Sequence, residues 1–350
     1  MPADTSPGSP ASAGPVRAFI AGCAGPVLTP AERAFFAQAA PWGFILFRRN
    51  VETPDQLRAL VADLRAAVGR HAPVLIDQEG GRVQRLGPPH WPAYPPAAVF
   101  AGMAEQGRAH AAMDAARLGA RLMAEDLASL GIDVDCVPCA DLRLPEGHGI
   151  IGDRAYGETP SQVASLARAA ADGLLDAGVL PVLKHIPGHG RARADSHEAL
   201  PVVETPRDVL EATDFEPFRR LNDLPLGMTA HVVYAAIDPD HPATTSARVI
   251  AEIIRGHIGF DGALMSDDLS MKALAGSFAA RTRASIAAGC DLVLHCNGDM
   301  AEMAEVAAAA PLLEGEAARR CASALARIRR SGDFDVSSAR RRFSDMIAVT

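Results

Sequence analysis

The sequence predicts an α/β fold, a single-domain (β/α)8 barrel of the TIM type, and three observations lead to this prediction. Eight short apolar runs recur along the chain, and segments with a helical spacing of apolar residues separate them. Polar side chains stand where several of the runs end, which is where a barrel of this type builds its active site. The main alternative is an open, doubly wound sheet. It is less favoured because no Gly-x-Gly-x-x-Gly turn follows an early run.

The apolar runs predict the strands. Their near-continuous hydrophobicity suits strands that are buried on both faces of a parallel sheet. They lie at residues 17–25, 43–47, 73–77, 132–142, 181–185, 226–231, 263–268 and 291–296. Between them, segments such as 54–68 and 160–175 carry one apolar stripe each, as amphipathic helices do. Residues 299–350 are expected to be helices that finish the barrel.

Four Thr-Pro pairs predict helix starts. A threonine hydroxyl can cap the helix while the proline occupies its first position. Glu, Gln or Asp follows three residues after each threonine, which is the capping-box spacing. The pairs are Thr29-Pro30, Thr53-Pro54, Thr159-Pro160 and Thr205-Pro206.

Composition limits the class of protein. The 350 residues are 49% hydrophobic and 22% charged, as in ordinary globular chains, and the net charge of −8 argues against nucleic acid as the main partner. Residues 1–16, rich in Pro, Ser, Gly and Ala, are predicted to be a disordered tail, not a signal peptide. Residues 17–350 are predicted to be one catalytic barrel domain. No apolar run reaches the roughly 18 residues of a membrane span, so we expect a cytoplasmic monomer without a membrane partner.

The six cysteines are too few for a disulfide framework in a chain of this length. The Cys136-x-x-Cys139 pair lies inside an apolar run, and no second pair accompanies it. We therefore expect buried free thiols and no metal.

Polar residues end five of the apolar runs, and we expect them to converge on one pocket. In a regular strand, the neighbours Lys184 and His185 would point in opposite directions, and both are candidate donors to ligand oxygens. The five run ends are Asp77, Lys184-His185, His231, Asp267-Asp268 and His295.

The segment 184–197, KHIPGHGRARADSH, follows the fifth run. Gly188 and Gly190 supply mobility, and residues 191–194 carry no apolar anchor, so we expect an arm that moves over the pocket. In the tripeptide Asp195-Ser196-His197, the carboxylate can orient the imidazole and stabilise its protonated form. Such a histidine can act first as a general acid and then as a general base.

Two further motifs and one pair of aromatic residues each have a structural and a functional interpretation. Residues 77–85, DQEGGRVQR, form either a solvated loop with ion pairs or a clamp for sugar hydroxyls. Asp267-Asp268 is either a charge pair at a helix start or the source of a nucleophilic carboxylate. Trp91 and Tyr94, in the loop that follows residues 77–85, either stack on a sugar ring or pack in the wall.

Four motifs together resemble the β-N-acetylhexosaminidases of glycoside hydrolase family 3, of the bacterial peptidoglycan-recycling type. They are IDQEGGRVQR, GDRAYG, KHIPGHGRARADSH and LMSDDLSM, which run in the family's order over roughly residues 70–275. Ile186 departs from the phenylalanine usual in the family. The resemblance implies that Asp267 is the nucleophile and that His197, paired with Asp195, is the acid/base. It implies no cofactor, and it assigns substrate binding to Asp77, Arg85, Arg154, Lys184 and His185.

The resemblance also implies the reaction. We expect a retaining exo-glycosidase that removes terminal β-linked N-acetylglucosamine from muropeptides with a GlcNAc–anhydro-MurNAc unit. The family's two-domain β-glucosidases take their acid/base from a second domain. The sequence shows no sign of that domain and carries the Asp-Ser-His arm instead.

Three alternatives remain from the sequence. The first is a zinc-dependent barrel hydrolase that uses His185, His189, His197 and His231. It is disfavoured because no His-x-His follows the first run and a lysine occupies the pocket. The second is a sugar-binding protein without activity. The third is transfer of the sugar to phosphate instead of water.

Overall fold

Eight parallel strands close into a barrel in this computed structural model, which describes residues 14–145, 147, 149–196, 199–329 and 332–348. The predicted (β/α)8 barrel is confirmed, and the doubly wound sheet is wrong. The strands follow the ring order β1-β12-β11-β9-β7-β6-β3-β2. Their bounds are β1 Arg17–Gly22, β2 Pro41–Leu46, β3 Val74–Ile76, β6 Val134–Asp135, β7 Leu180–Ile186, β9 Leu226–Thr229, β11 Ala263–Asp268 and β12 Leu292–His295.

Each predicted run overlaps one barrel strand, but the fourth run is mostly irregular. β6 has two residues, whereas the run spans residues 132–142. Pro138 has no N–H to donate, so a regular ladder cannot continue through it. Beyond β6 the chain still bonds to its neighbours, with Cys136 N–H donating to the Ile76 carbonyl at 2.9 Å and Ala140 N–H to that of Lys184 at 2.7 Å. The run therefore stays in the barrel wall without being a long strand.

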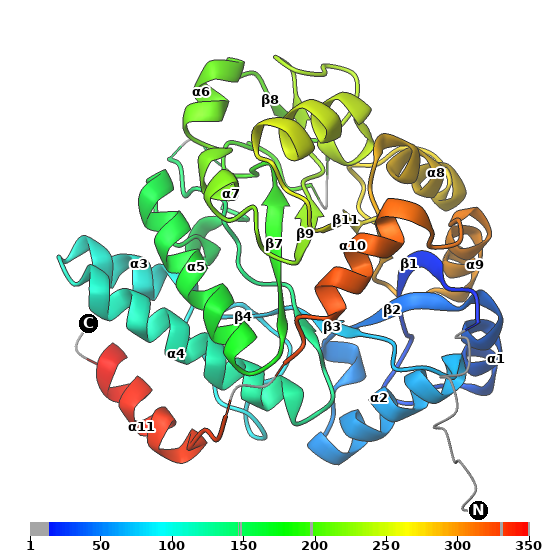
Figure 1. The fold of residues 1–350 in the computed structure, drawn as a ribbon, viewed down its shortest axis with the longest axis horizontal. Helices are drawn as coiled ribbons and strands as arrows, with labels where there is room; N and C mark the ends of the chain where they lie inside the picture. Colours follow the sequence, from blue (N-terminus) through cyan, green and yellow to red (C-terminus); the bar gives the residue numbers. More distant parts are fainter. Residues whose placement is uncertain (1–13, 146, 148, 197–198, 330–331, 349–350) are drawn as a thin grey trace, which may run out of the picture.

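Helices surround the barrel (Figure 1). In the chain that the structure describes, no helix has both the length and the apolar character needed to cross a membrane. The longer helices are α1 Pro30–Ala39, α2 Pro54–Val68, α3 Ala97–Glu105, α4 Ala109–Ala128, α5 Pro160–Asp176, α8 Phe278–Ala288, α9 Met300–Ala309, α10 Gly315–Leu325 and α11 Val336–Ile347. The shorter pieces are α6 Arg207–Ala212, α7 Glu216–Arg220, the π-helical η4 Val249–His257, and the 3₁₀ turns η1 Arg48–Asn50, η2 Gly152–Arg154 and η3 Ala243–Thr245.

Two small sheets lie outside the barrel ring. Strands β4 Gln78–Gly80 and β5 Val83–Gln84 pair antiparallel as a hairpin directly after β3. Strands β8 Val202–Val203 and β10 Val233–Tyr234 pair in parallel. Both sheets follow the carboxyl ends of barrel strands, so they build up the side of the barrel where the predicted site residues stand.

Three of the four predicted threonines stand at the N-cap position, but only two of them cap the helix with the hydroxyl. Thr29 forms a complete capping box with Glu32 at the start of α1, and Thr53 accepts a hydrogen bond from the Gln56 N–H at 3.2 Å. Thr159 precedes α5 without a side-chain cap. The fourth prediction is wrong, because α6 begins at Arg207 and its capping residue is Pro206, whose ψ of 147° is extended.

Buried aspartates pin the amino ends of barrel strands. Asp291 precedes β12, and its carboxylate accepts the Leu264 N–H of β11 at 2.9 Å. The same carboxylate pairs with Arg255 at 2.7 Å and with Arg320 at 3.1 Å. Asp133, which precedes β6, accepts a backbone N–H of β3 in the same way. Each of these carboxylates ties one strand to its neighbour and is neutralised by arginine.

Candidate active site

The carboxyl ends of the strands surround a cavity that is open to solvent. It lies on the side where barrels of this type place their chemistry. Its apolar lining includes Phe47, Met228 and Leu294. Its lining also includes six of the eight predicted site residues: Asp77, Arg85, Arg154, Lys184, His185 and Asp267.

Lys184 is the centre of an ion-pair cluster in this cavity. Its side chain is only 2% exposed, and Nζ lies 2.9 Å from Asp77 Oδ1 and 2.6 Å from Glu79 Oε1. Asp77 also pairs with Arg85 at 3.0 Å. Burial by itself would raise the pKa of Asp77, but Lys184 and Arg85 outweigh burial and hold that pKa well below its usual range. The cluster therefore keeps an ionised carboxylate beside fixed N–H donors, which suits the binding of hydroxyl groups.

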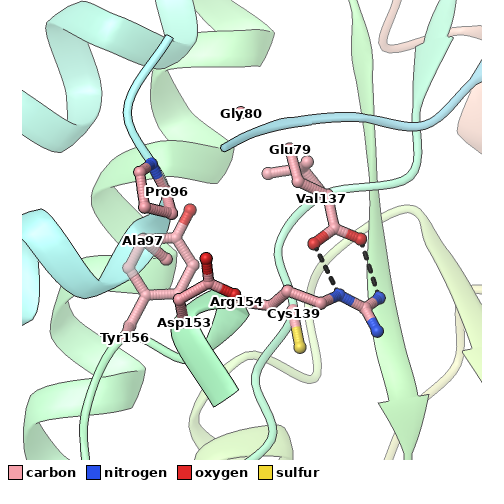
Figure 2. A pocket seen from close by; sticks show the side chains of 9 residues that line it. All are labelled: Glu79, Gly80, Pro96, Ala97, Val137, Cys139, Asp153, Arg154 and Tyr156. Atoms are coloured by element: carbon pink, nitrogen blue, oxygen red, sulfur yellow. Dashed lines mark hydrogen bonds and ion pairs between the residues drawn. The ribbon is translucent and has the colours of Figure 1, made fainter. Parts of the chain in front are cut away.

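Arg154 grips Glu79 with two nitrogens, as Figure 2 shows, each 2.8 Å from a carboxylate oxygen. Burial opposes ionisation of Glu79, yet Arg154 and Lys184 lower its pKa to about 2. Arg154 comes from η2, so this pair fastens the loop that contains GDRAYG to the hairpin of β4 and β5. Sequence reasoning did not single out Glu79. It stands in β4, two residues after Asp77, within the motif DQEGGRVQR at residues 77–85.

Lys184 and His185 both line the cavity, so the expectation that they point in opposite directions is wrong. The register between β7 and β9 shifts between Lys184 and Ile186, and regular alternation therefore does not hold at this point. His185 Nδ1 lies 2.6 Å from Oδ2 of the fully buried Asp141. Asp141 is a second residue that sequence reasoning missed.

Asp267 and Asp268 both line the cavity but have different surroundings. The Asp268 carboxylate accepts the backbone N–H groups of Ser270 at 3.0 Å and Cys296 at 3.1 Å, so it holds the turn after β11. Among the described residues, the Asp267 carboxylate accepts one hydrogen bond, from the Asp268 N–H at 2.8 Å. Burial raises the pKa of Asp267, but His185 and His231 outweigh it and lower the pKa. Asp267 is thus ionised and less engaged than its neighbour.

Two of the five predicted run ends do not line the cavity, which corrects the expected convergence. His231 is fully buried, with Nε2 3.0 Å from the Asp268 carbonyl oxygen and Nδ1 2.7 Å from Thr244 Oγ1. Because a carbonyl can only accept, His231 donates from Nε2 and supports the turn from behind. His295 is also buried and lies 3.0 Å from Glu302 of α9. Its position in β12 alternates with those of Leu294 and Cys296, both of which line the cavity.

Residues 188–196 of the arm are held by an ion pair and by burial, so the expected lack of an anchor is wrong, whereas the movement of the arm stays a prediction. Arg191 Nε lies 2.7 Å from the Oδ2 atom of Asp214, whose side chain is 2% exposed, and Ala192 is buried. Asp214 follows α6, so the sequence of the arm itself gave no sign of this partner. Asp195 is not among the cavity residues, and its carbonyl accepts the Ala199 N–H at 3.0 Å. His197 lies outside the described residues, so its contact with Asp195 stays a prediction.

Trp91 and Tyr94 are packed in the wall. They are 7% and 6% exposed, and neither lines the cavity. Tyr94 donates to Asp126 of α4 at 2.8 Å, and Asp126 also pairs with Arg340 of α11. Figure 1 shows α11 beside α4. Of the two interpretations, wall packing is the one that the structure supports.

Cys139, Asp141 and His185 have potential metal ligands within 4.8 Å of one another. These atoms are hydrogen-bonded to each other, since Cys139 Sγ lies 3.2 Å and His185 Nδ1 lies 2.6 Å from Asp141 Oδ2. A metal would have to displace both hydrogen bonds. The zinc alternative also needs His231, whose two nitrogens are already occupied. All six cysteines are free thiols, and five of them are buried.

Comparisons with known proteins agree with one another. Residues 30–330 match the model of the glycosyl hydrolase family 3 N-terminal domain. A β-hexosaminidase of Alkalilimnicola ehrlichii is 44% identical over 288 residues, which cover 80% of each chain. The structure of NagZ from Neisseria gonorrhoeae in complex with N-trifluoroacetyl-D-glucosamine has a TM-score of 0.83 and 33% identity, covering 96% of this chain and 97% of that one. A complex of the same NagZ with a zinc ion has a TM-score of 0.82 and 32% identity, covering 95% of this chain and 97% of that one.

Proposed function

Because this chain belongs to glycoside hydrolase family 3, we propose that it is a retaining β-N-acetylhexosaminidase that releases terminal β-linked N-acetylglucosamine. The observation that carries the proposal is one cavity whose lining brings together six residues from the four sequence motifs, Lys184 among them. The similarity to a NagZ bound to an N-acylated glucosamine supports the choice of sugar. We further propose that the natural substrates are muropeptides with a GlcNAc–anhydro-MurNAc unit, which are cleaved during cell-wall recycling in the cytoplasm. The enzyme would act as a monomer with one catalytic domain.

The proposed mechanism is a double displacement. Asp267 attacks the anomeric carbon while His197 protonates the departing glycosidic oxygen. Water, deprotonated by the same histidine, then cleaves the glycosyl–Asp267 ester. Asp195 would orient His197 and stabilise its protonated form. The ionised state of Asp267 supports the first step, since a nucleophilic carboxylate must be deprotonated.

The cluster around Lys184 would bind the sugar. Asp77 can accept hydrogen bonds from sugar hydroxyls, while Arg85, Arg154, Lys184 and His185 supply donors from fixed positions. The ion pairs Asp77–Lys184 and Glu79–Arg154 hold these donors in fixed positions around the cavity. A preorganised site of this kind loses little conformational freedom on binding.

The direct test is hydrolysis of 4-nitrophenyl N-acetyl-β-D-glucosaminide by the wild type, followed by product analysis on a purified muropeptide. We expect free N-acetylglucosamine with retained β-configuration, at a rate that phosphate does not change. A 2-fluorinated or 5-fluorinated substrate should trap a covalent adduct, and peptide mapping should place it on Asp267. An adduct on Asp268 would overturn the assignment of the nucleophile.

The acid/base role needs its own test, because His197 lies outside the described residues. The pH–rate profile of His197→Ala should lose the acid/base dependence of the wild type. The loss of kcat should be smaller for substrates whose leaving group needs no protonation. An unchanged profile would contradict the role. Sugar binding without any turnover would instead favour a binding protein.

A further inference from the structure

Asp141 is a buried carboxylate beneath the cavity that the proposed mechanism does not use. It stands in the irregular segment after β6 and is fully buried. Oδ2 lies 2.6 Å from His185 Nδ1, and Oδ1 accepts the His189 backbone N–H, also at 2.6 Å. One carboxylate therefore contacts both the end of β7 and the beginning of the arm.

The contact with His185 fixes which nitrogen of the imidazole carries a proton. Burial favours the neutral acid of Asp141, but the imidazoles of His185 and His189 and their hydrogen bonds hold its pKa well below the usual range. An ionised carboxylate can only accept, so His185 Nδ1 must donate. No described residue hydrogen-bonds to Nε2 of His185, which lines the cavity. Nε2 is consequently the nitrogen available to a ligand.

The contact with His189 extends into the arm. The His189 ring is 3% exposed, and its Nε2 lies 3.3 Å from Oγ of the buried Ser196. Ser196 stands between Asp195 and His197, and its carbonyl accepts the Ala273 N–H at 3.2 Å. The arm is thus connected to Asp141 at its beginning and, through the His189 ring, close to its end.

We propose that Asp141 is a positioning residue that sets both the ligand-facing nitrogen of His185 and the placement of the arm that carries Asp195 and His197. This inference rests on the proposed function, because it concerns the geometry of that same reaction. Asp141 touches no substrate itself. It contacts both the His185 ring and the beginning of the arm, and so it fixes the position of each relative to the other.

The test is Asp141→Asn, which keeps the size of the side chain. The Asp141 carboxylate accepts the His185 ring N–H and the backbone N–H groups of His185 and His189. Asparagine has only one acceptor oxygen, and its NH₂ group would face at least one of these donors. We expect kcat/KM on 4-nitrophenyl N-acetyl-β-D-glucosaminide to fall by about 10- to 100-fold, as when an orienting partner of a histidine is lost. Cys139→Ala is the matched control, since it removes the longer Sγ contact to the same carboxylate; its kcat/KM should stay within about threefold of wild type.

A double-mutant cycle separates positioning from general damage. In a His185→Ala background, Asp141→Asn should cost much less than it does in the wild type, because part of its effect runs through His185. Full additivity of the two losses would overturn the proposal. So would a loss of less than about threefold for Asp141→Asn alone. If the wild type itself does not hydrolyse the substrate, the proposed function fails instead.

Ser196→Ala removes the contact between the His189 ring and the end of the arm and leaves Asp141 unchanged. This variant can be measured even if Asp141→Asn does not fold. Deleting one hydrogen bond should lower kcat by about two- to tenfold with little change in KM, since the arm would bring the acid/base and not the sugar-binding groups. Ser196→Thr, which keeps the hydroxyl, should recover most of the activity. Unchanged kcat in Ser196→Ala would overturn the connection between Asp141 and the arm.

Discussion

The two ends of the barrel both bury carboxylates beside arginine or lysine, but they use them differently. At the amino end, the Asp291 carboxylate accepts the Leu264 N–H and pairs with Arg255 and Arg320, and Asp291 does not line the cavity at the carboxyl end. At the carboxyl end, Asp77 and Lys184 are paired and still line a cavity. The ion pairs at the amino end join neighbouring strands. The ion pairs at the carboxyl end hold polar atoms at the surface of the cavity.

This difference separates stability from function along the barrel axis. A fully satisfied buried ion pair fixes the strands, and removing one partner leaves the other charge buried without compensation. A buried pair that lines a cavity also offers unused hydrogen-bonding capacity to a ligand. Substituting a cavity-lining residue should therefore change activity more than stability, and substituting an ion-pair partner at the amino end should do the reverse.

The largest expected effect is on activity, from Asp267→Asn at the carboxyl end. Loss of the nucleophile should lower kcat/KM by about a thousandfold or more. The unfolding free energy should change by less than about 1 kcal/mol, because the Asp267 carboxylate accepts a single hydrogen bond among the described residues. Steady-state kinetics and urea unfolding measure the two quantities. A loss of stability as large as that expected at the amino end would break the comparison.

The second effect is on stability, from Asp291→Ala at the amino end. The substitution removes the carboxylate that pairs with Arg255 Nη2 and accepts the Leu264 N–H, so the Arg255 charge stays buried without its ion-pair partner. The unfolding free energy should therefore fall by about 3–5 kcal/mol. At a temperature where the variant is folded, kcat should match the wild type. The matched control is Asp261→Ala, which removes a 65% exposed carboxylate from the same Arg320 and should cost less than about 1 kcal/mol. Equal losses in the two variants would contradict the role of burial.

The third effect is a pH dependence of stability from His189. Burial, reinforced by His185, lowers the pKa of His189 to about 4, although Asp141 and Asp267 oppose this shift. The unfolded chain therefore binds a proton at a higher pH than the folded protein does. Stability from the neutral ring is complete above about pH 6.5 and is lost as the pH falls toward about 4, by about 3 kcal/mol in total.

The His189→Gln variant isolates that contribution. Glutamine does not titrate, so the variant should lose less stability than the wild type between about pH 6.5 and 4. Urea unfolding at several pH values gives both curves. Parallel curves would show that another group is responsible.

The smallest effect comes from Tyr94→Phe, at the carboxyl end but outside the cavity. The variant loses the hydrogen bond to Asp126, and the unfolding free energy should fall by about 1 kcal/mol. KM for the chromogenic substrate should not change, because Tyr94 does not line the cavity. A raised KM would mean that this aromatic ring contacts the sugar after all.

The sequence predicted the barrel because hydrophobic periodicity is a local property that survives into the structure. Each of the eight runs overlaps one barrel strand, and the family inferred from four motifs is confirmed. The same rule also indicated much of the cavity, because Asp77, Lys184 and Asp267 stand at or near the carboxyl ends of strands. The prediction from strand ends was wrong for His295. Side chains alternate between the two faces of a strand, so His295 points away from the cavity that its neighbours Leu294 and Cys296 line.

Partners distant in sequence could not be predicted. Nothing in residues 188–196 indicates that Arg191 pairs with Asp214, so the arm looked unanchored. Asp141 stands near the end of the fourth apolar run, where the apolar pattern predicts a continuous strand. Its position is still a usable signal, because polar residues at the ends of the other runs are site candidates.

The ring order has a consequence for synthesis on the ribosome. β1 is made first, yet one of its two neighbours is β12, the last strand of the ring to emerge. Until residue 296 has left the exit tunnel, one edge of β1 has no neighbour and the wall that includes Leu294 and Cys296 is missing. The closing pair β1–β12 therefore has the largest separation in sequence of any strand pair in the ring, and the barrel cannot close before β12 is made.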